Sequence, residues 1–293
     1  MTDLSRVAPS STAHLQRRQV LAALALLPMV AGTQAASSDA SNASSAPDAA
    51  ALHAAVDGPQ RSAANRARDA ARHPYETLAF FGLRPDWQVV EIAPGGGWYT
   101  EILAAYLNPK GRLYAAHEPA DGTAGQQRAR AAFRAKLAAD PATYRRVVLG
   151  TLPVTRFTDI HPPGGADAVL TFRNIHNWIA DGHFDETLRA FFDVLKPGGV
   201  LGVEEHRAAP GTSLARVIES GYVPQDFVVE RARAAGFVLA GASEINANPR
   251  DSHDHAQGVW ALPPTLRGGA VDREKYLAIG ESDRMTLKFV KAG

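Results

Sequence analysis

The sequence of 293 residues contains no cysteine, so it has no disulfide framework and no thiolate chemistry. A strong charge of one sign is also absent, because 31 lysines and arginines face 30 aspartates and glutamates, for a net charge of +1. That balance gives no sign of a nucleic-acid surface, and we expect no nucleic-acid partner. Hydrophobic residues make up 45% of the chain, which is ample for a sizeable core.

Long apolar runs are scarce as well, and the only one lies near the N-terminus. The segment VLAALALLPMV at residues 20–30 is too short to span a bilayer comfortably, and Pro28 interrupts it. It follows Arg17-Arg18 and precedes the small residues around Ala35. This order is typical of a secretory signal, and the arginine pair resembles a twin-arginine leader, which exports folded proteins. We expect residues 1–35 to be a signal peptide, ranking this above an uncleaved anchor or an accidental basic–apolar run. The mature protein would then be periplasmic and not stably inserted in a membrane.

The remaining chain divides into a short polar segment and one long domain. Residues 36–58 are rich in alanine, serine, asparagine and aspartate, which predicts a disordered linker. In the domain at 59–293, apolar runs alternate with helical patterns, which predicts parallel βαβ units and a doubly wound α/β fold. The expected strands are 88–92, 113–117, 147–149, 168–172 and 200–204, with helices at 99–107, 125–139, 184–195 and 225–235. Strands at 237–245 and 284–290 would form an antiparallel pair at the sheet edge.

The most informative motif is EIAPGGGWYT at residues 91–100, which reads as strand, glycine turn and helix. A carboxylate ends the strand, and the glycines let a ligand approach the backbone at a helix N-terminus. The spacing Glu-x-Ala-x-Gly-x-Gly resembles the first motif of class I S-adenosylmethionine (SAM) methyltransferases. A dinucleotide motif would have a third glycine where Thr100 stands, which favours SAM over NAD. A glycine-rich turn without a ligand is the plain alternative.

Further motifs strengthen the resemblance, which covers most of the chain from about Arg66. They are RHPxETL at 72–78, FRNxHNW at 172–178, LKPGG at 195–199 and SDRxxLKF at 282–289. Together they are similar to a group of predicted, exported bacterial methyltransferases. The resemblance implies a Rossmann-like seven-stranded sheet with an antiparallel last strand, SAM as the cofactor and a small-molecule acceptor that the sequence does not identify.

The resemblance also implies a set of cofactor-binding residues at the first two strand ends. Gly95 and Gly97 would pack against SAM in one loop with Ala93 and Pro94, while Glu91 would organise the loop. At the end of the second strand, Glu118 would bind the ribose hydroxyls, although His117 stands where many relatives have the acid. The aspartate that commonly follows the third strand in the family is missing here, so either backbone groups or Thr151 recognise adenine or the cofactor binds weakly.

The fourth and fifth strand ends carry the candidate catalytic residues. Asn174 would position the acceptor through its amide, and His176 is the best general base because imidazole titrates near neutrality. The alternative is that Asn174 caps a turn and His176 is a structural histidine. On the fifth strand we expect Glu204 to form ion pairs, with Glu205 and His206 as pocket residues.

The segment between the last two strands, 246–283, is long for a compact domain, and such loops tend to be functional or mobile. It contains His253 and His255 beside aspartates, which suits either a metal site or a solvated, charged lid. We favour the lid and expect no metal. The resulting hypothesis is a SAM-dependent methyltransferase, and the alternative is an exported ligand-binding protein that uses the same fold without catalysis.

Overall fold

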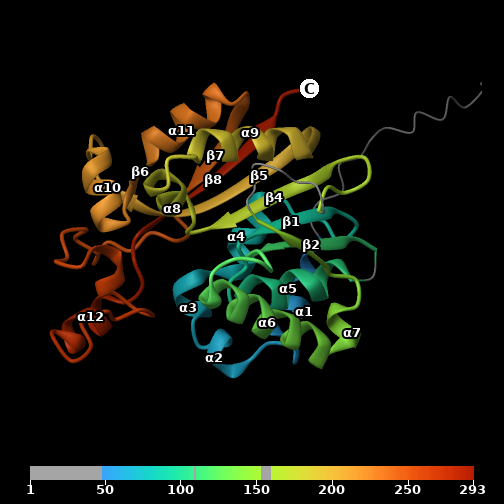
Figure 1. Ribbon diagram of the computed structural model, residues 1–293, viewed down its shortest axis with the longest axis horizontal. Coiled ribbons are helices and arrows are strands. Elements are labelled where there is room, and N and C mark those ends of the chain that lie inside the picture. Colours follow the sequence, from blue (N-terminus) through green and yellow to red (C-terminus); the bar gives the residue numbers. More distant parts are fainter. Residues whose placement is uncertain (1–47, 109, 153–159) are drawn as a thin grey trace, which may run out of the picture. The chain divides into compact units, whose positions relative to one another are not determined.

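The computed structural model describes residues 48–108, 110–152 and 160–293 (Figure 1). The predicted signal peptide and the first part of the predicted linker lie outside the described residues. Among the helices that the structure describes, none combines the length and the apolar character needed to cross a membrane.

The core of the fold is a mixed β-sheet. Its strands are β1 (Gln88–Ile92), β2 (Arg112–His117), β3 (Val148–Thr151), β4 (Ala166–Phe172), β5 (Leu195–Ala208), β6 (Val223–Pro224), β7 (Phe237–Ser243) and β8 (Arg284–Lys291). They lie in the order β3-β2-β1-β4-β5-β8-β7, and the short β6 pairs with the end of β5. Strands β1 to β5 pair in parallel, whereas β8 runs antiparallel to both β5 and β7. This confirms the predicted doubly wound α/β sheet with an antiparallel last strand.

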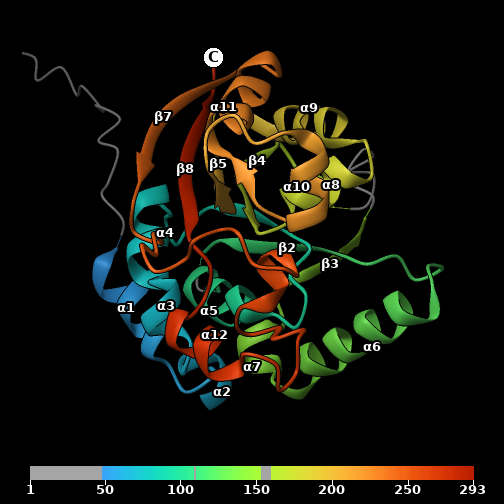
Figure 2. The same ribbon diagram turned by 90° about the vertical axis from the view of Figure 1, so that its left-hand side faces the viewer.

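Helices cover both faces of this sheet (Figure 1 and Figure 2). On one face lie α1 (Ala49–Asp57), α4 (Pro74–Phe81), α5 (Trp98–Leu107) and α7 (Pro141–Tyr144), and on the other lie α8 (Ile175–Ala180), α9 (Phe184–Val194), α10 (Leu214–Ser220) and α11 (Gln225–Ala234). Two short helices, α2 (Ala63–Arg66) and α3 (Asp69–Arg72), precede α4, and α6 (Ala124–Ala139) follows β2. Successive strand residues alternate between the two cores, so that Val89 joins one and Val90 the other.

One sequence expectation is wrong at the N-terminal end of the described chain. The linker predicted over 36–58 does not extend through residue 57, because Ala49–Asp57 forms helix α1. The side chain of Asp48 caps it by accepting a hydrogen bond from the Ala51 N–H at 3.0 Å. Leu52 and Val56, four residues apart on one helix face, are buried in the core beside α5. That burial stabilises a segment whose composition alone predicts disorder.

The segment between β7 and β8 is ordered and partly buried. It contains a 3-10 helix, η1 (Gly258–Ala261), and α12 (Arg273–Ile279). Asn246, Asp251 and His255 are buried, and the Asp251 carboxylate accepts hydrogen bonds from the Tyr222 hydroxyl and the Asp283 N–H. The lid expected here as a solvated segment is therefore packed against the body of the domain, because its polar side chains find partners inside the fold.

Candidate functional site

The glycine loop joins β1 to α5 at the carboxyl edge of the sheet. Ala93, Gly95 and Gly97 have positive φ angles of 47°, 56° and 82°, and the Gly97 N–H closes the turn on the Pro94 carbonyl at 2.9 Å. A Cβ atom added at Gly95 or Gly96 would meet nothing within 4 Å. Among the described residues, the N–H groups of Gly95 and Gly96 also have no hydrogen-bond acceptor. This part of the loop therefore presents open, unpaired donors beside a helix N-terminus.

Glu91 supports this loop from below. Its side chain is buried, with 1% of the residue exposed, and it accepts a hydrogen bond of 2.7 Å from the Thr100 hydroxyl on α5. Burial raises its pKa from 4.5 to about 7, although the bond from Thr100 and the charge of Lys136 oppose the rise. The Glu91 carboxylate thus holds the first turn of α5 in place. Its ionisation costs free energy unless a further positive group lies beside it.

The next strand end places His117 against the same loop. Its Nε2 lies 3.1 Å from the Gly95 carbonyl oxygen, and its Nδ1 accepts the Glu118 N–H at 2.7 Å. These partners assign the proton to Nε2, and burial lowers the pKa of His117, so the ring is neutral. His117 is therefore a loop support. Glu118 keeps a half-buried carboxylate at the strand end, where one oxygen accepts a hydrogen bond from Gln126 at 2.9 Å.

Helix α6 lies along these strand ends and touches them through one face. Lys136 donates to the Gly96 carbonyl at 3.1 Å, and the ring of Phe133 packs on His117 with centroids 4.6 Å apart. A Cβ atom added at Gly97 would come within 3.1 Å of Phe133. Gly97 thus permits the close approach of α6, whereas Gly95 and Gly96 form the open part of the loop.

The end of β4 brings Asn174 to the end of β1. The amide nitrogen of Asn174 donates to the Ile92 carbonyl at 3.3 Å and to the Thr171 hydroxyl at 3.2 Å. It does not form the side-chain cap of α8 that a turn-capping role would give. Its amide nitrogen ties two neighbouring strand ends together, within the edge that carries the glycine loop.

His176 and Glu205 form a hydrogen-bonded dyad. His176 Nδ1 lies 3.0 Å from a Glu205 carboxylate oxygen, and both side chains are buried. The carboxylate also accepts the backbone N–H groups of Ile175 at 2.6 Å and His206 at 2.9 Å, which fix its orientation. With a proton on Nδ1 directed at Glu205, the Nε2 of His176 is left as an acceptor. This arrangement suits a general base.

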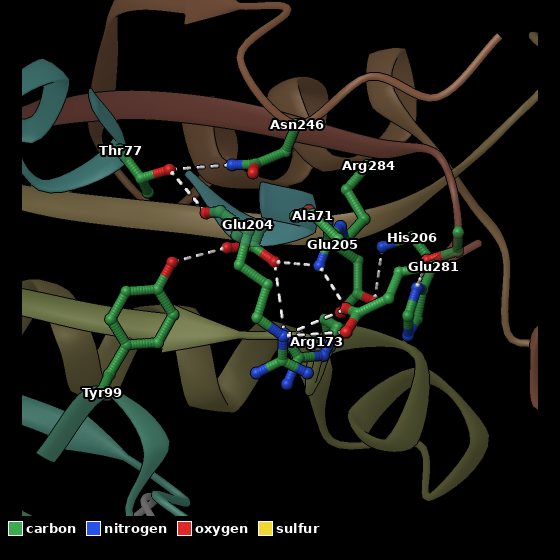
Figure 3. Close-up of polar contacts among 12 residues, drawn as sticks. Ala71, Thr77, Tyr99, Arg173, Glu204, Glu205, His206, Asn246, Glu281 and Arg284 are labelled. Atoms are coloured by element: carbon green, nitrogen blue, oxygen red, sulfur yellow. Dashed lines mark hydrogen bonds and ion pairs between the residues drawn. The ribbon is translucent and has the colours of Figure 1, made fainter. Parts of the chain in front are cut away.

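Sequence reasoning missed a buried ion network that lies beside Glu205 and His206 (Figure 3). Glu204 on β5 contacts Arg284 at 3.1 Å and Arg173 at 3.3 Å, and it accepts a hydrogen bond from the Tyr99 hydroxyl at 3.1 Å. The ion pairs expected for Glu204 are thereby confirmed. Glu281, from the segment before β8, contacts Arg284 and the arginines of α3 and its N-cap, Arg72 and Arg68. The signal was present in the unusual motifs at 72–78, 172–178 and 282–289, which converge here.

In the described part of the chain, the one group of side chains spaced closely enough to hold a metal ion does not include His253 or His255. Among the described residues, His176, Glu205 and His206 have potential ligand atoms within 4.8 Å of one another. Glu205 already accepts three N–H groups, however. His253 and His255 bond to different carboxylates, of Asp283 at 3.2 Å and Asp251 at 2.9 Å, and so do not converge as the metal alternative requires.

Comparisons with solved structures define the fold. No protein-family model and no curated protein matches the sequence. The cyclase SpnF is 19% identical, with a TM-score of 0.53 over 80% of this chain and 85% of that one. A protein from Galdieria sulphuraria assigned as a sarcosine dimethylglycine methyltransferase is 11% identical, with a TM-score of 0.54 over 76% and 84%. A SAM-dependent methyltransferase from Aquifex aeolicus is 15% identical, with a TM-score of 0.50 over 83% and 98%. The fold is that of the SAM-dependent methyltransferases.

Proposed function

We propose that this protein is a SAM-dependent methyltransferase acting on a small-molecule acceptor. The observation that carries the proposal is the juxtaposition of an open glycine loop over Glu91 with the His176–Glu205 dyad, at neighbouring strand ends of this fold. In open α/β sheets, ligands bind beyond the carboxyl ends of the strands near the point where strand order reverses. Here β1 lies between β2 and β4, so the reversal falls at the glycine loop.

The residues present fit the cofactor. The open faces and unpaired N–H groups of Gly95 and Gly96 suit its carboxylate, while Ala93 and Pro94 shape the turn. Glu91, whose pKa is raised by burial, gains a partner if a positive group approaches. Glu118 keeps a carboxylate at the second strand end for the ribose hydroxyls. When bound, SAM supplies an activated methyl group.

The chain's own residues then have three tasks: to orient the acceptor, to exclude water and to take up its proton. His176 Nε2 accepts the proton of the acceptor's nucleophilic atom, and the Nδ1–H bond to Glu205 holds the ring and stabilises the imidazolium. Asn174 keeps the end of β4 in place against β1. Alignment of the two reactants provides much of the acceleration in such a displacement.

Calorimetric titration of the chain lacking residues 1–35 with SAM and with its demethylated product tests the proposal. We expect both ligands to bind, and we expect Gly95→Val, which fills the open face of the loop, to weaken both at least about tenfold. Gly198→Val, at a second positive-φ glycine with open space far from the loop, is the matched control. Absence of binding at millimolar ligand in a folded sample would refute the cofactor assignment.

A second candidate is an exported ligand-binding protein without catalysis. The reason to keep it is that the fold alone does not fix a function, since the structurally similar SpnF is named as a cyclase and not for methyl transfer. We further propose that the leader at residues 1–35 exports the folded chain with its cofactor to the periplasm. Mass spectrometry of the protein isolated from the periplasm tests both ideas. A retained mixture of SAM and its demethylated product would support turnover, and recovery of the protein only from the cytoplasm would refute export.

A further inference from the structure

The buried ion network holds more positive than negative side chains. Four arginines, Arg68, Arg72, Arg173 and Arg284, share the two carboxylates of Glu204 and Glu281. Adding the nearby Glu205 still leaves an excess of positive charge. Burial together with the charge of Arg173 lowers the pKa of Arg72 from 12.5 to about 9. Burial, and then the charges of His176 and Arg173, hold the pKa of His206 well below its usual value. The site therefore lacks a negative partner.

Two of these arginines have donors to spare. Arg173 makes one contact of 3.3 Å from Nη1 to Glu204, and 23% of its side chain is exposed. Arg72 bonds to Glu281 only through Nε, and its guanidinium lies 4.8 Å from the ring of Trp98. Among the described residues, the other guanidinium nitrogens of Arg72 and Arg173 have no hydrogen-bond acceptor. A guanidinium recognises a carboxylate through parallel N–H bonds, and these nitrogens are free to form them.

Arg173 has a strained backbone conformation in the segment that also carries the proposed base, His176. Arg173 has a left-handed φ of 62°, which is costly for a residue with a long side chain, and its N–H bonds to the Glu204 carbonyl at 2.7 Å. Three residues later the same turn carries His176. The strained residue and the proposed base therefore project from one short segment at the end of β4.

We propose that Arg72 and Arg173 bind an anionic group, a carboxylate or its equivalent, of the methyl acceptor beside His176. The inference rests on the proposed function and names the class of acceptor: a small acid whose nucleophilic atom lies near its carboxylate. A carboxylate also occurs in SAM itself, but the unpaired N–H groups of Gly95 and Gly96 already suit that one.

The test uses acetate and benzoate as probes of the anion site. Their binding to the chain lacking residues 1–35, saturated with demethylated SAM, is measured by calorimetry at constant ionic strength against chloride. We expect at least one probe to bind, and Arg173→Gln to weaken it at least about tenfold. Arg173→Lys, which keeps the positive charge but not the two parallel N–H donors of the guanidinium, should give an intermediate loss of affinity for the probe. Arg216→Gln, at a side chain of α10 that is 39% exposed and pairs with Glu219, is the matched control and should change nothing.

The outcomes separate this inference from the proposed function. If neither probe binds while demethylated SAM does, the anion site is refuted and the methyltransferase assignment stands. If Arg173→Gln weakens demethylated SAM about tenfold but leaves methylthioadenosine, which lacks the carboxylate, unaffected, the site serves the cofactor and our assignment to the acceptor is overturned. If the cofactor does not bind at all, the proposed function fails, and titration of the probes into the free protein still decides whether the anion site exists.

Discussion

Glu91→Gln is the substitution whose effect on stability follows most directly from the structure. Glutamine has the same shape as glutamate, and its amide oxygen still accepts the hydrogen bond from Thr100. What it removes is a buried negative charge, because Glu91 is 1% exposed and burial raises its pKa from 4.5 to about 7. The variant should therefore fold more stably at alkaline pH and bind the cofactor less well.

The size and the sign of the effect both come from that pKa. Between about pH 4.5 and about pH 7 the folded carboxyl keeps a proton that the unfolded chain has lost, so the stability of the wild type falls as pH rises. Above about pH 7 both states are ionised and the loss is complete. At about 1.4 kcal/mol per pH unit, the full effect is about 3 kcal/mol. Glu91→Gln does not titrate, so its advantage should appear across this window and then stay constant.

Urea denaturation of both proteins at about pH 4.5 and about pH 8 measures the difference. Glu186→Gln, on the exposed side of α9, controls for the general effect of removing a carboxylate. We expect the gain from Glu91→Gln to be larger at the higher pH by about 3 kcal/mol, and that from Glu186→Gln to be equal at both. An equal gain in the free energy of unfolding at both pH values, or no gain at pH 8, would refute the view that the ionised, buried Glu91 destabilises the fold unless a positive ligand binds beside it.

The remaining predictions concern the dyad, the segment before β8 and metals. His176→Asn should lower turnover about 100-fold while leaving the affinity for demethylated SAM within about twofold, because only the proton acceptor is lost. Calorimetry measures the affinity, and the rate at which demethylated SAM is formed measures the turnover. Asp283→Asn should lower the free energy of unfolding by about 2 kcal/mol, because His253 and Arg207, which keeps its ion pair with Glu244, lose charge-assisted hydrogen bonds to a buried carboxylate. Burial favours a higher pKa for Asp283, but hydrogen bonds from His253 and Arg207 hold this pKa below its usual range. The loss of stability in Asp283→Asn should therefore persist from neutral pH down to about pH 4. A chelator should leave turnover unchanged, because the base is a side chain; a loss restored by a divalent metal would contradict this.

Local patterns were sufficient to predict most of the fold. The helices expected at 99–107, 125–139, 184–195 and 225–235 each agree with the structure within one residue at either end. Their periodicity and the glycines that punctuate them depend on neighbours in the chain. Helix α1 was missed because its alanine-rich sequence gives no such signal. It forms by burying Leu52 and Val56 against α5, about fifty residues away along the chain.

The parts of the site that lie within one sequence motif could be predicted, whereas contacts between residues far apart in the sequence could not. The glycine loop and Glu91 belong to one motif, so their juxtaposition could be predicted from spacing. Spacing predicts Glu118 as the ribose ligand, but it does not predict the role of His117, which depends on the Gly95 carbonyl that its ring meets in the fold. The pairing of His176 with Glu205 joins two strands, and the ion pair between Arg72 and Glu281 spans 209 residues. Only the sheet order brings such residues together.

The buried ion network is better explained by ligand binding than by stability. Removing charges from water costs several kcal/mol for each ion, and well-packed apolar residues often stabilise a core as much as buried ion pairs. Glu204 is fully buried, and Arg284 is almost so, with a buried Nε that lacks a partner. In a cluster kept for stability alone, the numbers of positive and negative side chains would be equal, whereas this one has more arginines than carboxylates, beside the His176–Glu205 dyad. The excess of positive charge costs free energy that an anionic ligand would offset, so the affinity for acetate or benzoate, and not the melting temperature, is the measurement that decides the role of the network.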